Sequence, residues 1–167
     1  MSFTLTPVDA TDKPELYRQL LQQLEGLLHG ERDWVANAAN ASALLWHTLP
    51  QLNWVGFYFL RGGELVVGPF QGKPACVRIA LGRGVCGTAA ASGTTQVVPD
   101  VHEFPGHIAC DAASRSEVVV PLMHAGRVVG VLDLDSPEPG RFDAADAAGL
   151  EQVAALFSTA TDWAPLL

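Results

Sequence analysis

Basic residues are scarce in this sequence. Lysine and arginine together number 10, against 18 aspartates and glutamates, which gives a formal net charge of −8 at pH 7. A field of that sign repels phosphate backbones and anionic lipid surfaces. The composition therefore argues against nucleic acid and membranes as partners.

Long hydrophobic runs are also missing. No uninterrupted apolar stretch reaches about eighteen residues, the length that a membrane-spanning helix needs. Residues 1–7 carry no basic flank ahead of a hydrophobic stretch, so they do not resemble a secretion signal. We therefore expect a cytoplasmic protein.

Cysteine is sparse and irregularly spaced. Cys76, Cys86 and Cys110 form an odd set with no C-x-x-C pair, which excludes a secreted disulfide framework and a zinc ribbon. The spacing fits no familiar zinc site, even with His102 or His107 as a further ligand. We expect no metal, and thiols that matter as reactive groups.

The composition itself predicts a globular protein. Apolar residues make up 49% of the 167 residues and charged residues 17%, too much core material for a disordered chain. A chain of this length builds one core. We expect a single domain over 1–167, with leading helices at 13–50 and a sheet, a loop and a closing helix at 53–161.

Helical periodicity governs the first part of the chain. Asp12 and Glu15 have the spacing of a capping box, and leucines follow at intervals of three or four residues to about Gly30. A second apolar stripe begins at Trp34, and Pro50 lies just past its end. These patterns predict two amphipathic helices.

Strand patterns dominate from residue 53. The expected strands are 54–60, 64–70, 76–80, 95–98, 118–122 and 127–135, with a short helix at 85–92 and a closing helix after Asp143. Two pairs of strands flank glycine turns and predict hairpins. Hairpins with helices at both chain ends predict an α+β fold, an antiparallel sheet with helices packed on a face.

The segment Gly82-Arg-Gly-Val-Cys-Gly87 matches the G-x-G-x-x-G pattern of dinucleotide-binding loops. That unit also needs a full crossover helix and a parallel strand with an acid about twenty residues on, whereas here the helix stops at Gly93. We interpret the motif as a glycine turn before a short helix. Cys86 would then feel the helix dipole, which lowers the pKa of a thiol.

The strand over 54–60 carries aromatic residues on both faces. Alternation places Trp54, Gly56 and Tyr58 on one side, and Val55, Phe57 and Phe59 on the other. Two rings with a glycine between them predict a gap with aromatic walls, and both rings carry a polar group. Plain aromatic packing is the alternative.

The strand over 127–135 carries acids on an apolar face. By alternation one face holds Val129, Val131, Asp133 and Asp135, and the other holds Val128, Gly130, Leu132 and Leu134. The carboxylates need solvent, hydrogen bonds, a metal or a cationic ligand, and Glu117 can join them from the adjacent strand. A magnesium site lacks the basic phosphate-binding residues expected nearby, while a solvated strand end stays open.

Residues 99–116 form the one long connection without periodicity, and such loops are commonly functional. Cys110 lies in a polar part of this loop, where we expect it to be exposed, and His107 is close in sequence. A free thiol is only about 3% thiolate at pH 7. A nucleophilic Cys110 therefore needs a cation, a helix end or an acid acting on the substrate.

Six blocks of the sequence closely resemble the free methionine-(R)-sulfoxide reductases, small enzymes with the GAF fold. The blocks are Asn53-Trp-Val-Gly-Phe-Tyr58, Gly68-Pro-Phe-Gln-Gly-Lys-Pro-Ala-Cys76, Gly82-Arg-Gly-Val-Cys-Gly87, Val98-Pro-Asp-Val-His102, His107-Ile-Ala-Cys-Asp-Ala-Ala-Ser-Arg-Ser-Glu117 and Gly130-Val-Leu-Asp-Leu-Asp-Ser136. The resemblance covers nearly the whole chain. It implies a GAF-like fold and a homodimer.

The resemblance also implies a reaction, in which free methionine-(R)-sulfoxide is reduced to methionine. The Cys110 thiolate would attack the sulfoxide sulfur, methionine would leave, and Cys110 would remain as a sulfenic acid. Cys76, or Cys86 as the second choice, would then condense with it to a disulfide. Thioredoxin would reduce that disulfide, so no cofactor is expected.

The pocket residues fit that scheme. Trp54 and Tyr58 would enclose the methyl sulfoxide end of the substrate, while Glu117, Asp133 and Asp135 would hold its ammonium group and offer a proton to the sulfoxide oxygen. Crowded acids raise at least one pKa among them. A closed acidic pocket also selects a free amino acid over a peptide, which lacks the ammonium group.

Sensing without turnover is the alternative function. GAF folds also serve as modules that bind a small ligand, or a bilin through a cysteine, and a thiol redox switch is a further option. Three cysteines exceed what a sensor needs, and we expect no output domain after Leu167. The appearance of methionine would separate the enzyme from both alternatives.

Overall fold

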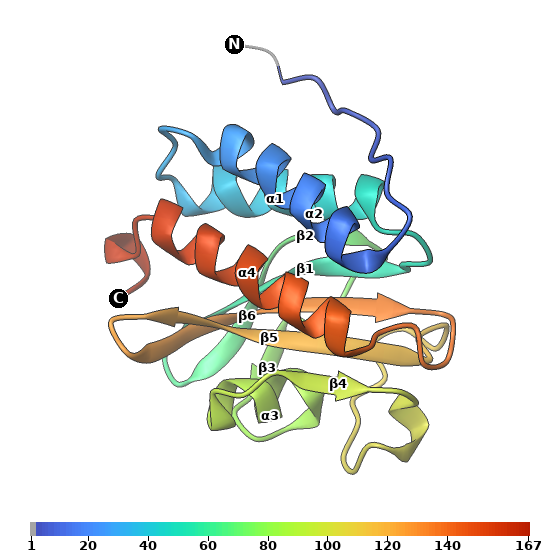
Figure 1. The fold of residues 1–167 in the computed structure, drawn as a ribbon. Coiled ribbons are helices and arrows are strands. Elements are labelled where there is room, and N and C mark those ends of the chain that lie inside the picture. Colours follow the sequence, from blue (N-terminus) through green and yellow to red (C-terminus); the bar gives the residue numbers. More distant parts are fainter. Residues whose placement is uncertain (1–2) are drawn as a thin grey trace.

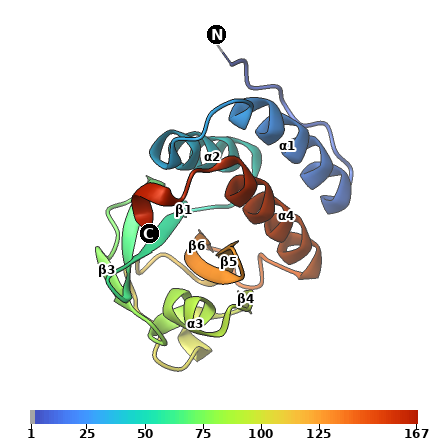
Figure 2. The same cartoon turned by 90° about the vertical axis from the view of Figure 1, so that its left-hand side faces the viewer.

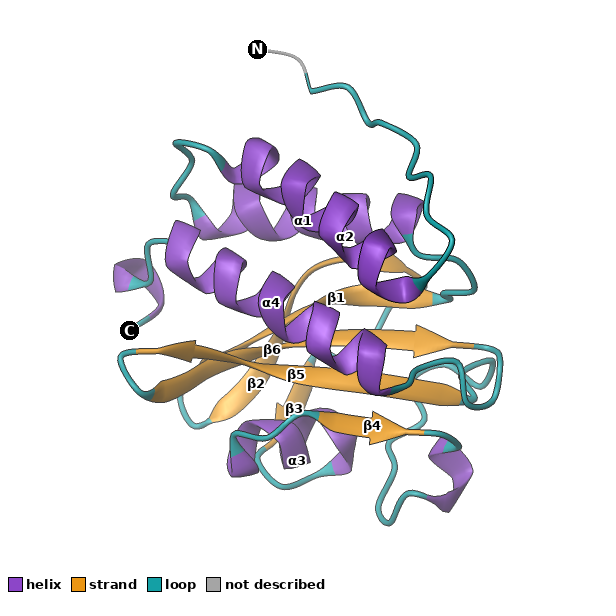
Figure 3. Ribbon diagram, in the orientation of Figure 1, coloured by secondary structure: helices purple, strands orange, loops and turns teal. Residues whose placement is uncertain are grey.

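The structure is a computed structural model that describes residues 3–167, and a six-stranded antiparallel sheet forms its middle layer (Figure 1, Figure 3). The strands, in the spatial order β3-β2-β1-β6-β5-β4, are β1 (Trp54–Arg61), β2 (Glu64–Gly72), β3 (Arg78–Ala80), β4 (Gln96–Val98), β5 (Ser116–His124) and β6 (Arg127–Ser136). The predicted α+β fold is confirmed, with the predicted order of helices and strands.

Helices cover both faces of the sheet. Three of them, α1 (Lys13–Leu28), α2 (Trp34–Thr48) and α4 (Ala144–Ala160), lie on one face, and α3 (Gly84–Ser92) lies on the other (Figure 2). Two short 3₁₀ helices span Val101–Glu103 and Ala164–Leu166. Within residues 3–167, no helix is both long enough and apolar enough to cross a bilayer.

Aspartate side chains cap the three larger helices. Asp143 and Asp146 form a complete capping box at the start of α4. At α1 the box predicted from the spacing is only half formed. Asp12 accepts a hydrogen bond from the backbone N–H of Glu15 at 2.9 Å, but the Glu15 carboxylate pairs with Arg18 instead.

The sheet separates two apolar cores, and β1 contributes to both. Val55, Phe57 and Phe59 are buried against the three-helix layer, whereas Trp54 and Tyr58 belong to the core next to α3. The predicted alternation along β1 is therefore confirmed. The aromatic pocket wall faces α3, away from the larger core.

The start of β6 departs from the predicted alternation. Val129 is buried in the three-helix core and Val128 packs against the core next to α3, which reverses the predicted faces. The cause is a shift in register between Leu122 and Met123 of β5, which pair with Gly130 and Val128 and leave Val129 unpaired as a β-bulge. The faces of Asp133 and Leu134 follow the prediction.

The glycine motif before α3 forms a turn, as predicted. The backbone N–H of Gly82 donates to the carbonyl of Gly87 at 2.8 Å, and Gly93 ends α3 in the left-handed conformation, with φ of 65°. Every strand pair that the structure describes is antiparallel. The parallel strand of a dinucleotide-binding unit is therefore absent from residues 3–167.

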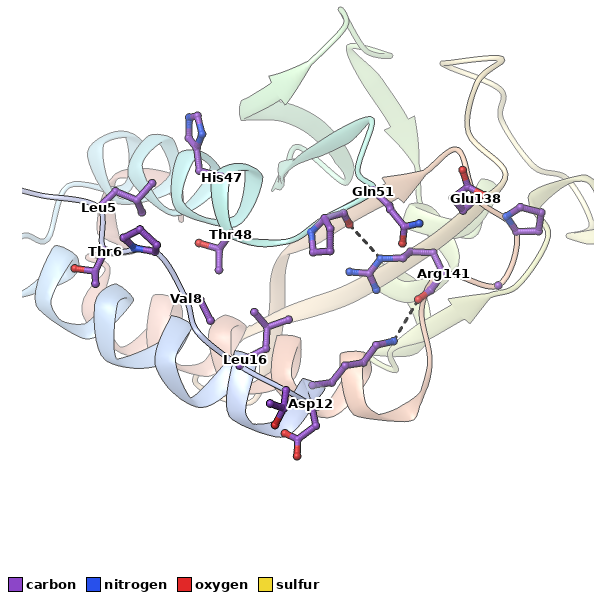
Figure 4. A pocket seen from close by; sticks show the side chains of 17 residues that line it. Leu5, Thr6, Val8, Asp12, Leu16, His47, Thr48, Gln51, Glu138 and Arg141 are labelled. Carbon is purple, nitrogen blue, oxygen red and sulfur yellow. Dashed lines mark hydrogen bonds between the residues drawn. The ribbon is translucent and has the colours of Figure 1, made fainter.

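An open groove of about 920 Å³ lies on the helical side of the molecule, where the segment before α1 passes the end of α2 (Figure 4). Arg141 crosses one wall and donates from Nε to the carbonyl of Pro50 at 3.2 Å. None of the three cysteines lines this groove. The reactive residues gather on the opposite side of the sheet.

Candidate active site

A small pocket of about 50 Å³ lies between the sheet and α3. Its wall includes all the predicted site residues except Cys76, namely Trp54, Tyr58, Cys86, Cys110, Glu117, Asp133 and Asp135. Cys76 is bonded to Cys110. The structure therefore brings together residues from β1, α3, β5, β6 and the 99–115 connection.

Two stacked rings form the aromatic wall. Trp54 and Tyr58 have centroids 5.8 Å apart and an interplanar angle of 29°. Trp54 Nε1 donates to the carbonyl of Lys73 at 3.2 Å, and the Tyr58 hydroxyl donates to the carbonyl of Cys76 at 3.0 Å. The polar groups of both rings thus tether the segment that carries Cys76.

The predicted gap at Gly56 is filled. A Cβ atom at this position would overlap the Cβ of Phe70 on β2, and the Phe70 ring stacks on Trp54 with centroids 5.1 Å apart. The prediction of an open gap was wrong because it left out the neighbouring strand. Gly56 permits close packing of β2, and the pocket opens beside the rings instead.

The three acids lie on one face of the sheet because of strand register. Trp54 pairs with Asp135, and Asp135 pairs with Glu117, which makes a row across three strands. Asp133 follows two residues away on the same face. Glu117 and Asp133 are only 6% and 5% exposed, and Asp135 is half-buried.

These carboxyl groups have little to stabilise their charges. Among residues 3–167, no lysine or arginine pairs with them, and the basic side chain that approaches them is His107, with Nε2 3.9 Å from Oε2 of Glu117. Burial raises the pKa of Asp133 to about 6 and, together with the charge of Asp133, holds the pKa of Glu117 and of Asp135 well above the usual range. The cluster therefore holds protons near neutral pH.

Cys86 faces the same acids from the first turn of α3. It is 4% exposed, and its Sγ lies 3.9 Å from Oε1 of Glu117, as a weak donor. Burial, then the charges of Asp133 and Glu117, raise its pKa well above the usual value. The prediction of a lowered pKa was wrong because desolvation and two nearby acids outweigh the dipole of a short helix.

A disulfide joins Cys76 and Cys110, whose Cα atoms lie 5.7 Å apart. Cys110 is exposed, as predicted, and Cys76 is half-buried. His107 lies on the same connection, and burial lowers its pKa, which favours the neutral imidazole. The two sulfurs that the resemblance pairs are thus bonded at the rim of the acidic pocket.

The chain matches the GAF domain family over residues 10–162. It is 53% identical to the free methionine-R-sulfoxide reductase of Escherichia coli over 144 aligned residues, and the alignment covers 86% of this chain and 87% of that protein. The protein YtsP of Bacillus subtilis is 59% identical over 145 residues, 86% of this chain and 89% of that one.

A solved structure gives the same result. The free methionine-R-sulfoxide reductase of Neisseria meningitidis, in complex with its substrate, matches with a TM-score of 0.91 and 48% identity over 95% of each chain. This chain belongs to the GAF-domain free methionine-R-sulfoxide reductase family. The resemblance seen in the six sequence blocks is confirmed.

Several residues that support the pocket of this reductase were not predicted from the sequence as site residues. Asn53 Nδ2 donates to Asp111 Oδ2 at 3.1 Å and to Ser114 Oγ at 2.9 Å, which fixes the 99–115 connection to the start of β1. Asp111 and Ser114 also line the pocket. Their only signal in the sequence was their place in the same blocks as Trp54 and Cys110.

Proposed function

We propose that this protein reduces free methionine-(R)-sulfoxide to methionine and is itself oxidised to a disulfide. The observation that carries the proposal is a bonded cysteine pair, Cys76 and Cys110, at the rim of a pocket that combines aromatic walls with buried acids. A thiol pair supplies the two electrons that sulfoxide reduction needs. The acids supply protons and a site for an ammonium group.

Cys110 is the nucleophile in this proposal. Its thiolate attacks the sulfoxide sulfur and takes up the sulfoxide oxygen together with one proton. The products are methionine and a sulfenic acid at Cys110. The Cys76 thiol then displaces the oxygen as water and forms the disulfide. Exposure of Cys110 in the loop supports this assignment, and the buried Cys86, with a raised pKa, is the weaker candidate for either role.

Glu117, Asp133 and Asp135 bind the substrate in two ways. Ionised members attract its ammonium group, and a protonated member, Glu117 or Asp133, donates to the sulfoxide oxygen as it leaves sulfur. Trp54 and Tyr58 contact the methyl group. The raised pKa values of the acids support proton donation near neutral pH, and the enclosed acidic wall supports selection of a free amino acid.

Thioredoxin restores the thiols in this scheme. The exposed Cys110 lies near the exposed apolar side chains of Val77 and Ile108, which supports access by a protein dithiol.

We also propose that the protein is a homodimer, as the family resemblance implies, and that residues 1–167 form a single GAF-like domain. We propose a cytoplasmic location, where free thiols persist. Sedimentation at several concentrations tests the dimer.

The deciding experiment uses both epimers of free methionine sulfoxide with a thioredoxin system. We expect one methionine for each molecule of the R epimer consumed, and little reaction with the S epimer. Without reductant, Cys76→Ser should release about one methionine per site, and Cys110→Ser none. Equal rates on the epimers, or no methionine at all, would contradict the proposal, and the second result would favour ligand sensing.

A further inference from the structure

One side-chain cluster in the pocket combines a thiol with two carboxylates, whereas binding of the substrate's ammonium group needs only the carboxylates. Cys86 Sγ and one carboxylate oxygen each from Glu117 and Asp133 all lie within 4.8 Å of one another, and all three residues are buried. They come from α3, β5 and β6. Across the pocket, His107 Nε2 lies 3.9 Å from the second oxygen of Glu117.

The chemistry of these four side chains differs from that of an ammonium site. Carboxylates suffice to bind an ammonium group, whereas thiolate, imidazole and carboxylate together are the ligands that Zn²⁺ takes. In a tetrahedral zinc site the ligand atoms lie about 3.5 Å apart, so small side-chain movements would bring Cys86, Glu117 and Asp133 into position. His107 lies outside that group and would have to move further to join it. The four residues can therefore supply a full set of ligands.

Two further observations point to a cation here. Asp133 Oδ1 is buried and has no hydrogen-bond partner among the described residues, an unfavourable state that a cation would relieve. The pocket, at about 50 Å³ with the disulfide formed, has room for a single ion.

We propose that Cys86, Glu117, Asp133 and His107 bind Zn²⁺ or a similar divalent cation in competition with the substrate. The prediction of no metal rested on the spacing of the three cysteines and on the lack of basic phosphate-binding residues near the acids. This set uses only one of the cysteines and needs no phosphate. Binding of the cation follows from the cluster alone. The competition rests on the proposed function, because it requires that the substrate use the same acids.

The test starts from the disulfide form of the full protein, in which Cys86 is the one free thiol among the three cysteines. Co²⁺ serves as the spectroscopic probe, because a thiolate bound to Co²⁺ absorbs by charge transfer in the near ultraviolet. We expect that band at one Co²⁺ per chain, and its loss when Zn²⁺ is added. A protein that binds Co²⁺ without the band would overturn the proposal.

Variants then assign the ligands by Zn²⁺ titration calorimetry. Cys86→Ser and Asp133→Asn should each weaken Zn²⁺ binding by at least about tenfold, the lower end of what even outer-shell partners cost. His107→Ala should weaken Zn²⁺ binding as well, whereas the control His102→Ala should not, because His102 is exposed and lies outside the cluster. Unchanged affinity in both Cys86→Ser and Asp133→Asn would overturn the site.

Competition is measured separately, on a variant with both Cys76→Ser and Cys110→Ser, which the substrate cannot oxidise to the disulfide and in which Cys86 is the one remaining cysteine. Free methionine sulfoxide should displace Co²⁺ and abolish the band. If the band forms and the substrate fails to displace it, the metal site stands and the placement of the substrate on these acids is wrong. If the band never forms, the metal proposal fails, and the epimer experiment still decides the proposed function.

Discussion

Two buried acids in this molecule have opposite surroundings. Asp146, at the start of α4, is fully buried and accepts hydrogen bonds from the Tyr17 hydroxyl at 2.8 Å and from Arg141 Nη1 at 3.2 Å. It also accepts from the backbone N–H of Asp143 and pairs with Lys13. Each oxygen of Asp146 therefore has charged or polar partners.

Asp133 lies on the other side of the sheet and lacks such partners. It is 5% exposed, its Oδ1 has no hydrogen bond within the described part of the chain, and its neighbours are Cys86 and two more acids. A buried charge is tolerated when it is paired and is costly when it is not. The difference separates an acid that stabilises the fold from the acids that we propose bind the substrate.

The largest expected effect is on stability, at the paired acid. Asp146→Ala removes the partner of Arg141, Lys13 and Tyr17 and should lower the free energy of unfolding by about 3–5 kcal/mol, because it leaves a buried cation uncompensated. Denaturant titration measures the change, with the exposed Glu25→Gln on α1 as control. A loss no greater than that of the control would remove the structural role of Asp146.

Asp133→Asn should affect catalysis rather than folding. Loss of a proton donor costs at least about 100-fold in kcat/KM, and we expect that fall for free methionine-(R)-sulfoxide with the dithiol reductant held in excess. The free energy of unfolding at pH 7 should not fall. Full activity together with lost stability would mean that the two acid clusters have been assigned in reverse.

The same variant should change how stability depends on pH. The folded pKa of Asp133, about 6, lies above the unfolded value of about 3.9, so the folded protein holds a proton that the unfolded chain releases between these values. The free energy of unfolding therefore falls as pH rises from about 4 through 6. Asp133→Asn removes this slope and should be about 3 kcal/mol more stable than the unmodified protein at pH 7.

The smallest effect is expected at Lys13, whose side chain is 33% exposed. Lys13→Met should cost about 1 kcal/mol, since a partly solvated pair contributes little. In this cluster the pH dependence has the opposite sign. The pKa of Asp143 is lowered to about 2, chiefly by its hydrogen bond with Lys13. The stability that this pair contributes is therefore lost as pH falls below about 4. Lys13→Met should make the free energy of unfolding depend less on pH in that acidic range.

Local patterns predicted most of the fold. The leucine spacing of α1, the glycine turns of both hairpins and the Asp143 cap of α4 each act within a few residues, so the sequence reveals them directly. The β-bulge at Val129 and the packing of Phe70 against Gly56 depend on a neighbouring strand. Alternation within one strand carries no information about either.

The parts of the site were predicted, and so was a raised pKa among the crowded acids, but the direction of the pKa shift of Cys86 was not. Trp54, Tyr58, Asp133 and Asp135 could be found because alternation placed aromatics and acids on one face. The raised pKa of Cys86 could not, because it depends on acids from two strands distant in sequence. The pairing of Cys76 with Cys110 came from the family resemblance, since a spacing of 34 residues indicates no partner.

In the proposed reaction, the pocket acids Glu117, Asp133 and Asp135 hold a proton for the sulfoxide oxygen. Carbon-13 NMR of the side-chain carboxyl groups across a pH titration measures this directly, with Asp133→Asn to assign the signals. We predict that at least one carboxyl group of Glu117, Asp133 and Asp135 is still half protonated at or above pH 6. Complete ionisation of all three below pH 5 would contradict the account.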